Sequence, residues 1–303
     1  MIEAKQLKKN FGKKVAVDGI SFRVDTGKVT GFLGPNGAGK STTMRLMLDL
    51  AEGEGQTLYD GKRLHDYVHP SEMVGILLEA KSFHPTRSAH NHLKILAIEG
   101  NIPLKRVDEV LDKVGLSSEA KESPGKFSLG MSQRLGLAAA LLANPTYLIL
   151  DEPANGLDPE GIVWLRKFLK SYADDSHGVF VSSHLLSEMS LLADNIVVIG
   201  KGKLLADTNM KDFISGNVGT SVFVRVKDND KFKEILDKEQ ISYIKENGGF
   251  NIEKLKTDKV GELAFRNKII VFELMTKTAS LEDAFLEVTV GSEEFNGKMP
   301  TNE

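Results

Sequence analysis

The segment Gly34-Pro35-Asn36-Gly37-Ala38-Gly39-Lys40-Ser41 decides how the rest of this 303-residue sequence is understood. It follows an apolar run at residues 29–33, which predicts a buried strand, and it precedes a helical pattern over residues 41–50. Glycines let backbone N–H groups turn inward around an anion, where a Cβ atom would clash. We therefore predict a phosphate-binding loop in which Lys40 reaches the β- and γ-phosphates and Ser41 binds Mg²⁺.

A second apolar run ends in two carboxylates, Leu148-Ile149-Leu150-Asp151-Glu152. A buried parallel strand presents such carboxylates at its C-terminal edge, where the phosphate-binding loop is also expected. Asp151 is predicted to hold Mg²⁺ through water, and Glu152 to orient or deprotonate the attacking water. An Asp-Glu pair after a strand is usually part of a helix cap when it stands alone. The loop upstream makes the catalytic interpretation the stronger one.

Strand and helix patterns alternate along the first two thirds of the chain. Strands are predicted at residues 2–4, 15–17, 20–24, 29–33, 56–59, 147–150, 179–182 and 195–199, and helices at 41–50, within 85–143, at 162–172 and at 185–193. Such alternation favours a largely parallel sheet covered by helices. The fold class is therefore predicted to be α/β.

The pattern changes after about Ser215. Strands are predicted at residues 221–226, 242–246, 250–253 and 269–274, and helices at 230–238, 258–267 and 280–288. This order predicts a smaller α+β unit, similar to the ferredoxin-like fold. We therefore predict a nucleotide-binding domain at residues 1–214, an accessory domain at 215–290 and a disordered polar tail at 291–303.

Composition excludes several classes of protein. The net charge of −3 provides no general field for nucleic acid, and the absence of cysteine excludes disulfides and thiol catalysis. The most apolar stretch, residues 135–143, is about half of the ~20 residues that a membrane span requires. We expect a soluble cytoplasmic protein that reaches a membrane only through a partner. The lysine cluster Lys5, Lys8, Lys9, Lys13 and Lys14 could attract anionic lipid or nucleotide, but a solvated strand face is the preferred interpretation.

Together with the motifs at residues 128–131, 155–158 and 182–184, the glycine loop and the Asp151-Glu152 pair make the sequence from Met1 to about Met210 resemble the ATP-binding cassette family. This family comprises the ATPase subunits of ABC transporters. The resemblance implies a P-loop fold of that type, with an antiparallel β subdomain and a helical signature subdomain. It implies that adenine stacks on an aromatic ring, here Phe11. The residues implied to bind ATP are Phe11, Gly34, Pro35, Asn36, Gly37, Ala38, Gly39, Lys40, Ser41 and Thr42.

The resemblance also implies that one chain supplies only half of each site. Ser128-Leu129-Gly130-Met131 lies where the family has its signature, and in this family two subunits pack head to tail, so that the signature of one closes over the P-loop of the other. Asp158 ends a segment similar to the family's D-loop, Asn155-Gly156-Leu157-Asp158. His184, which follows two serines, is implied to contact the γ-phosphate and to assist Glu152 in catalysis.

Two departures from the family pattern point to one branch. Glu79 stands where the family usually has Gln, and it is expected to hold a water near Mg²⁺. Leu129 and Met131 stand where Gly and Gln are usual in the signature. These features resemble the bacterial branch that exports bacitracin, daunorubicin-type drugs or lantibiotics.

The implied function is therefore an ATPase that dimerises around two Mg-ATP and powers export of a small molecule or peptide. A separate membrane permease is expected to dock near Glu79–Asn91 and to hold the subunit at the inner face of the cell membrane. No nucleic-acid partner is expected. Two alternatives are a soluble ABC ATPase acting on ribosomes or DNA, and a non-hydrolysing regulatory cassette. Against the second stand the intact Lys40, Asp151, Glu152 and His184.

Overall fold

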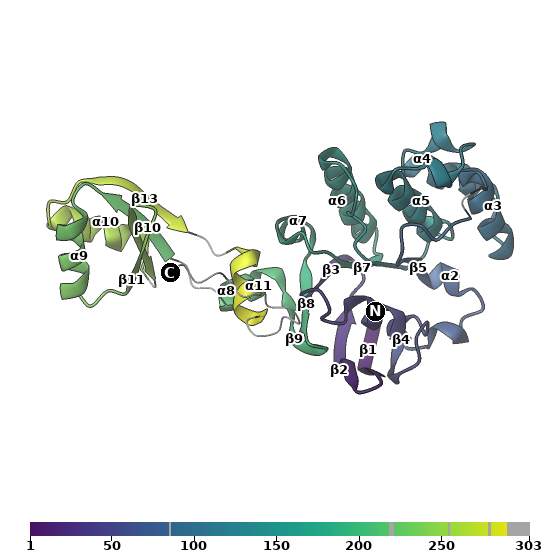
Figure 1. The fold of residues 1–303 in the computed structure, drawn as a ribbon, viewed down its shortest axis with the longest axis horizontal. Coiled ribbons are helices and arrows are strands. Elements are labelled where there is room, and N and C mark those ends of the chain that lie inside the picture. The colour runs from purple at the N-terminus through teal and green to yellow at the C-terminus, as the bar shows by residue number, and fades with distance from the viewer. Residues whose placement is uncertain (85, 218–220, 254, 278–279, 290–303) are drawn as a thin grey trace, which may run out of the picture. The chain divides into compact units, whose positions relative to one another are not determined.

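The computed structural model describes residues 1–289 except 85, 218–220, 254 and 278–279. The predicted tail at 291–303 lies outside the described residues. Contacts within the chain divide it into two compact units, which include Met1–Met210 and Lys211–Val288 respectively (Figure 1). In the described part of the chain, no helix is both long enough and apolar enough to cross a membrane.

A six-stranded sheet forms the centre of the first unit, with strand order β5-β6-β7-β3-β8-β9. All neighbouring strands are parallel except β8 and β9. The bounds are β3 (Lys28–Leu33), β5 (Val74–Leu77), β6 (Tyr147–Leu150), β7 (Gly178–Ser182), β8 (Asn195–Gly200) and β9 (Lys203–Asn209). Strands β6 and β7 are buried along their whole length, as is typical of parallel strands covered on both faces. The predicted α/β fold is confirmed.

Helices surround this sheet, and α3, α4 and α5 gather beyond β5 as a helical region (Figure 1). The bounds are α1 (Lys40–Met47), α2 (Pro70–Met73), α3 (Ala89–Glu99), α4 (Lys105–Lys113), α5 (Leu129–Leu141), α6 (Pro159–Asp174) and α7 (Leu186–Leu192). Helix α8 (Met210–Asn217) begins at the boundary between the two units. Helix α1 begins directly after the glycine loop and α5 begins at the signature segment. The helical region agrees with the prediction for residues 85–143.

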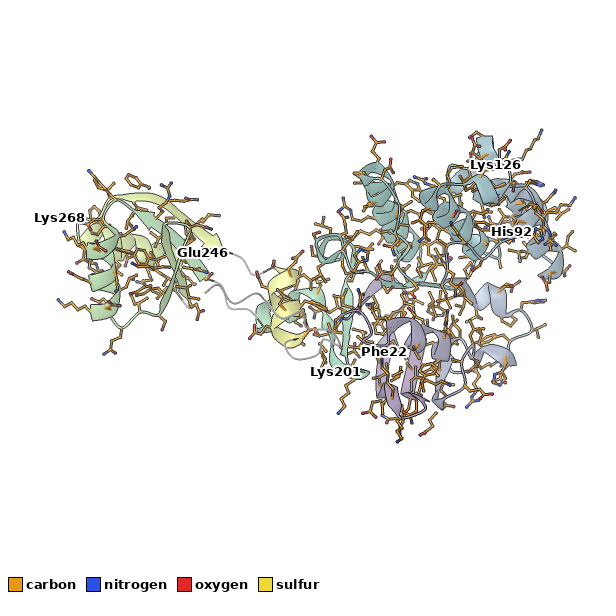
Figure 2. The ribbon with its side chains drawn as sticks, viewed as in Figure 1. Phe22, His92, Lys126, Lys201, Glu246 and Lys268 are labelled. Atoms are coloured by element: carbon orange, nitrogen blue, oxygen red, sulfur yellow. The ribbon has the colours of Figure 1, made fainter. Side chains whose placement is uncertain are left out.

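An antiparallel sheet packs against the parallel one. It contains β1 (Ile2–Phe11), β2 (Lys14–Val24) and β4 (Glu54–Tyr59) in the order β2-β1-β4. Phe22, labelled in Figure 2, belongs to β2. It stacks on Phe32 and Phe180 of the parallel sheet, with ring centroids 5.8 and 5.3 Å apart. Burying three aromatic rings in one cluster holds the two sheets together. This packing fixes the position of the β1–β2 hairpin, in which Phe11 is the last residue of β1 before the turn.

Three elements differ from the sequence-based prediction. The two short strands predicted at residues 15–17 and 20–24 form one continuous strand, β2. Strands β5 and β9 have no counterpart in the prediction, because β5 has only four residues and β9 is an edge strand without a clear alternation of buried and exposed positions. Both depend on pairing with a neighbour, β5 with β6 and β9 with β8.

The second unit has the chain order β-α-β-β-α-β of the ferredoxin-like fold, as predicted. Its antiparallel sheet has the order β11-β12-β10-β13. The bounds are β10 (Ser221–Val226), α9 (Asn229–Lys238), β11 (Tyr243–Glu246), β12 (Gly249–Glu253), α10 (Thr257–Arg266), β13 (Val271–Lys277) and α11 (Leu281–Thr289). Alternate residues of β10, including Val222 and Val224, form its core with Phe232, Phe250 and Ile252.

Candidate functional site

At Gly34 and Gly39, the loop between β3 and α1 packs too closely against its neighbours for a side chain to fit. A Cβ atom on Gly34 would lie 2.6 Å from the carbonyl oxygen of Ile199, and one on Gly39 would lie 2.4 Å from that of Ala16. Gly37 and Gly39 have φ angles of 81° and 106°, which glycine adopts readily. The sequence therefore forms the loop that exposes the N-terminus of α1 to an anion.

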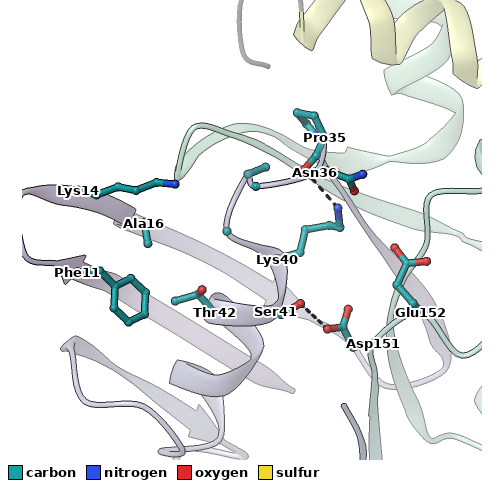
Figure 3. Close-up of a pocket in the computed structure, with 13 residues that line it drawn as sticks. Phe11, Lys14, Ala16, Pro35, Asn36, Lys40, Ser41, Thr42, Asp151 and Glu152 are labelled. Carbon is teal, nitrogen blue, oxygen red and sulfur yellow. Dashed lines mark hydrogen bonds between the residues drawn. The ribbon is translucent and has the colours of Figure 1, made fainter. Parts of the chain in front are cut away.

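A cavity of about 400 Å³ lies in front of this loop (Figure 3). Its walls are Phe11, Lys14, Ala16, Pro35, Asn36, Gly37, Ala38, Gly39, Lys40, Ser41, Thr42, Asp151 and Glu152. The Phe11 side chain is 57% exposed, so that its ring can accept a flat base. Lys14 borders the cavity, although a solvated strand face was the preferred interpretation of its lysine cluster. Only the folding of β2 beside the loop reveals that position.

Lys40 is buried and turned toward the loop. Its Nζ donates hydrogen bonds to the carbonyl oxygens of Gly34 at 2.6 Å and Pro35 at 3.4 Å. Burial lowers the pKa of Lys40, whereas the charges of Glu152 and Asp151 act to raise it. A phosphate in the cavity would therefore offer this ammonium group a stronger partner than the carbonyls provide.

Ser41 and Asp151 meet although they are 110 residues apart. The Ser41 hydroxyl donates to Oδ2 of Asp151 at 2.6 Å (Figure 3). The two oxygens stand on the phosphate side of the cavity, at the start of α1 and the end of β6. A hydroxyl and a carboxylate are ligands that suit Mg²⁺, which takes a few protein oxygens together with phosphate oxygens and water. The donor set thus fits a Mg²⁺ ion bound with nucleotide.

Glu152 and His184 also lie together, from the ends of β6 and β7. Nδ1 of His184 is 2.7 Å from Oε2 of Glu152, and the backbone N–H of His184 donates to the same oxygen at 3.2 Å. A carboxylate beside an imidazole at the edge of a phosphate cavity can orient or accept a proton from water. Both residues were singled out from the sequence.

Two residues that contact Glu152 were assigned no role of their own from the sequence: Ser182, the first of the two serines before His184, and Gln133, which follows the signature segment. Ser182 bonds to Asp151 and to the backbone of Glu152, and Nε2 of Gln133 donates to the carbonyl oxygen of Glu152 at 3.2 Å. The position of Ser182 beside His184 places it in a motif but does not predict these contacts. Gln133 lies on α5, so its contact depends on how that helix packs.

The signature and D-loop residues occupy helix starts away from the cavity. The Ser128 hydroxyl caps α5 by accepting from the N–H of Met131 at 3.1 Å, and Asp158 caps α6 by accepting from the N–H of Gly161 at 2.9 Å. A Cβ atom on Gly130 would lie 2.8 Å from the carbonyl oxygen of Gly156. Among the described residues that line the cavity, none belongs to the signature or the D-loop.

Glu79 borders a second cavity. Its carboxylate accepts a hydrogen bond from Arg45 at 2.8 Å, and both residues line this cavity of about 400 Å³. Glu79 is not among the described walls of the first cavity. Its predicted role in holding a water near Mg²⁺ stays a prediction. Other walls of the second cavity are Leu50, Ile76, Leu78, Phe83, His92 and Leu96.

Comparison with known proteins supports the same family. The model of the ABC transporter family matches residues 17–155, and a domain of unknown function matches residues 220–282. An uncharacterised ABC transporter ATP-binding protein of Bacillus subtilis, YhcH, is 37% identical, covering 95% of this chain and 96% of the relative. The bacitracin transport ATP-binding protein BcrA of Bacillus licheniformis is 36% identical, covering 96% of this chain and 98% of the relative.

Further similarities are to a transport subunit and to solved structures. The lantibiotic transport ATP-binding protein SrtF of Streptococcus pyogenes is 36% identical, over 68% of this chain and 90% of the relative. A structure described as the ATP-binding subunit of an ABC transporter is 26% identical with a TM-score of 0.65, covering 71% of this chain and 92% of that one. The dimeric cassette MJ0796 shares the fold, with a TM-score of 0.64, 22% identity and coverage of 69% and 99%.

Proposed function

This chain belongs to the ATP-binding subunits of ABC transporters, and from that premise we propose that two copies hydrolyse Mg-ATP between them and power export through a membrane permease. One observation carries the proposal. The cavity joins the phosphate-binding loop to Asp151 and Glu152 but contains no signature residue among its described walls. The single chain therefore has an incomplete site of the kind that a second copy completes.

The residues at the cavity are proposed to have separate roles in ATP hydrolysis. The N–H groups of the loop and Lys40 hold the phosphates, and the Phe11 ring holds the adenine. Ser41 and Asp151 would hold Mg²⁺, which neutralises charge on the phosphates. Glu152 accepts a proton from the attacking water, while His184 keeps the carboxylate oriented through their 2.7 Å contact.

The second half of the site is proposed to come from α5 of another copy. The Ser128 hydroxyl and the Gly130 N–H lie at the start of this 13-residue helix, where the partial positive charge of the helix favours a phosphate. The adjacent Leu129 side chain is 46% exposed, so this end of the helix is accessible to a partner. Asp158, which caps the nearby helix α6, is proposed to lie at the same interface.

Disulfide crosslinking tests the arrangement, because the chain has no cysteine of its own. A chain carrying Asn36→Cys would be mixed with a chain carrying Leu129→Cys, both with Glu152→Gln to prevent hydrolysis. We expect a crosslinked dimer to form with Mg-ATP and not with Mg-ADP. A matched pair with Val68→Cys in place of Leu129→Cys should not crosslink. Equal crosslinking with Mg-ATP and Mg-ADP would contradict the proposed dimer. So would a failure to crosslink with Mg-ATP.

The second cavity is the proposed docking site for the permease, near Glu79–Asn91. Leu50 and Ile76 are exposed apolar side chains at its rim, and Arg45 and Glu79 add a polar edge. Exposed apolar surface beside a cavity is typical of a protein interface. The names of the relatives, which include bacitracin and lantibiotic transport, support an exported peptide or similar small molecule as the substrate.

Co-purification from the native host tests this docking site. We expect the subunit to co-purify with a multi-span membrane protein, and Leu50→Asp to abolish that association while ATP hydrolysis by the isolated subunit persists. Val68→Asp is the matched control, because Val68 is also exposed but does not border the cavity. Recovery with ribosomes instead would support the soluble alternative and overturn the transport role.

The proposed localisation and domain roles follow from this assembly. The subunit would sit at the cytoplasmic face of the cell membrane, attached through the permease. Residues 1–214 are proposed to form the ATPase domain, and residues 215–290 an accessory domain. The two compact units found by contacts support this division, with the change of unit after Met210.

A further inference from the structure

Ser182, the first of the two serines before His184, makes contacts in the first unit that the sequence does not predict. It is the last residue of β7, and none of its surface is exposed. Its hydroxyl donates to Oδ1 of Asp151 at 2.5 Å and accepts from the backbone N–H of Glu152 at 2.9 Å. One side chain therefore holds both the carboxylate expected at Mg²⁺ and the backbone of the expected base.

The sheet order explains how this contact arises. Strands β6 and β7 are parallel neighbours, and Leu150 pairs with Val181, so the next residue of each strand lies at the same edge. A hydroxyl has one hydrogen and two lone pairs, so it can donate to a carboxylate and accept from an N–H at once. Alanine or valine at position 182 would satisfy neither group.

The backbone of Glu152 requires such support. Its φ angle is 49°, in the left-handed region that a non-glycine residue enters only when its surroundings hold it there. The Ser182 hydroxyl holds the N–H side of this residue, and Gln133 holds its carbonyl oxygen at 3.2 Å. In this conformation the carboxylate reaches His184.

Asp151 is held from two sides as well. Ser182 bonds to Oδ1, and Ser41 bonds to Oδ2 at 2.6 Å. When Ser41 turns to a metal ion, the Ser182 hydroxyl would be the remaining described hydrogen bond from a side chain to this carboxylate. The orientation of Asp151 toward the cavity then depends on Ser182.

We propose that Ser182 is a positioning residue that couples the Mg²⁺-binding carboxylate of Asp151 to the catalytic carboxylate of Glu152. Ser182 is not among the described residues that line the phosphate cavity. Through one hydroxyl it sets the direction of one side chain and the backbone conformation of the next residue. This inference rests on the proposed ATPase function.

The test compares Ser182→Ala with Ser182→Thr, which keeps the hydroxyl, and with Thr30→Val. Thr30 is an equally buried hydroxyl on the adjacent strand β3, with no hydrogen-bond partner for its oxygen among the described residues. Measurements on the full chain would be kcat and KM for ATP, the Mg²⁺ concentration giving half-maximal rate, Mg²⁺-free binding of a fluorescent ATP analogue, and Tm. Ser182→Cys, of nearly the same volume and a weaker donor, replaces the Thr variant if that one fails to fold.

We expect Ser182→Ala to lower kcat by about 10- to 100-fold, because a buried N–H loses its partner and the two carboxylates lose their alignment. The half-maximal Mg²⁺ concentration should rise by several-fold, about threefold or more, while Mg²⁺-free nucleotide binding stays within about twofold. Ser182→Thr should recover most of the rate, or Ser182→Cys an intermediate rate. Thr30→Val should match the unmodified chain.

The outcomes separate this inference from the proposed function. If the unmodified chain does not hydrolyse ATP, the proposed function itself fails. If it does, and Ser182→Ala keeps its kcat and Mg²⁺ dependence, the positioning role is overturned. It is also overturned if Ser182→Ala lowers Tm and weakens Mg²⁺-free binding as much as it lowers kcat, because that result describes a packing role alone.

Discussion

The two units of this chain differ in whether their charged side chains are buried or exposed. At the edge of the parallel sheet in the first unit, Lys40 and Ser182 are buried, and Glu152 has a left-handed backbone. In the second unit, the charged side chains lie at the surface, where Arg225 pairs with Glu273 at 3.3 Å while both remain nearly half-exposed. The core of that unit is built from apolar residues.

This difference shows that energetically unfavourable features, a buried charge and a left-handed backbone, occur together at the candidate site. Burying a charge or holding a non-glycine residue in the left-handed region is unfavourable unless neighbouring groups compensate for it. The first unit accepts both at the same edge, where the loop, Asp151 and Glu152 converge. In the second unit, Gln240, Asn247 and Lys268 also have left-handed backbones, but they lie in exposed turns, and no charged side chain is buried among the described residues of that unit.

The largest expected effect comes from changing a carboxylate at the strained edge. Glu152→Gln should lower kcat for ATP hydrolysis by about 10²- to 10⁴-fold, because a neutral amide cannot accept a proton from water. ATP binding should persist and the ATP-bound dimer should accumulate. Steady-state hydrolysis and size-exclusion chromatography measure both effects.

The matched control is Glu273→Gln, an exposed carboxylate of the second unit. It should leave the hydrolysis rate unchanged. An unchanged rate in Glu152→Gln would remove this residue from the base role, and an equal loss in both variants would remove the contrast between the two units.

A core truncation should show that the two units can be perturbed separately. Phe232 is fully buried and packs edge-to-face on Phe250, with ring centroids 5.5 Å apart. Phe232→Ala should lower the free energy of unfolding of the second unit by about 3–5 kcal/mol, because it leaves a cavity. Binding of ATP by the first unit should persist in denaturant concentrations that unfold only the second.

The control for this truncation is Phe272→Ala, since the Phe272 side chain is 56% exposed. Its effect should stay within about 1 kcal/mol. Loss of ATP binding together with the second unit, in a single unfolding transition, would show that the two units unfold together.

Lys40→Ala tests the phosphate-binding loop. We expect the affinity for ATP to fall by about 10- to 100-fold, because a charged hydrogen bond to phosphate is lost. Equilibrium binding of a fluorescent ATP analogue measures it. Lys233→Ala, an exposed lysine of α9, is the comparison and should bind ATP as before. Tight binding retained in Lys40→Ala would count against the assignment of the loop.

The smallest effect is expected at the surface pair of the second unit. Arg225→Ala should change the free energy of unfolding by about 0–1 kcal/mol, because both partners are solvated and screened by salt. Urea unfolding at low and high ionic strength measures the change. A loss of several kcal/mol would mean that this unit, too, depends on a polar cluster.

The sequence by itself determined the features that local chemistry specifies. The loop at residues 34–41 can be identified because glycine positions and the adjoining strand and helix act over a few residues. The carboxylates of Asp151 and Glu152 can be placed because a buried strand ends where they begin. The second unit follows its predicted elements closely, since alternation in strands such as β10 needs no distant partner to be recognised.

Only the tertiary structure decided which residues meet across the sheet. Ser182 contacts Asp151 because β6 and β7 are neighbours, and Lys14 borders the cavity because β2 packs beside the loop. Arg45 of α1 pairs with Glu79, which follows β5, at a second cavity. The short strand β5 and the edge strand β9 are likewise defined by their partners. Strand order and charge pairing bring together residues that lie far apart in the chain. The periodicity of a local segment does not predict such contacts.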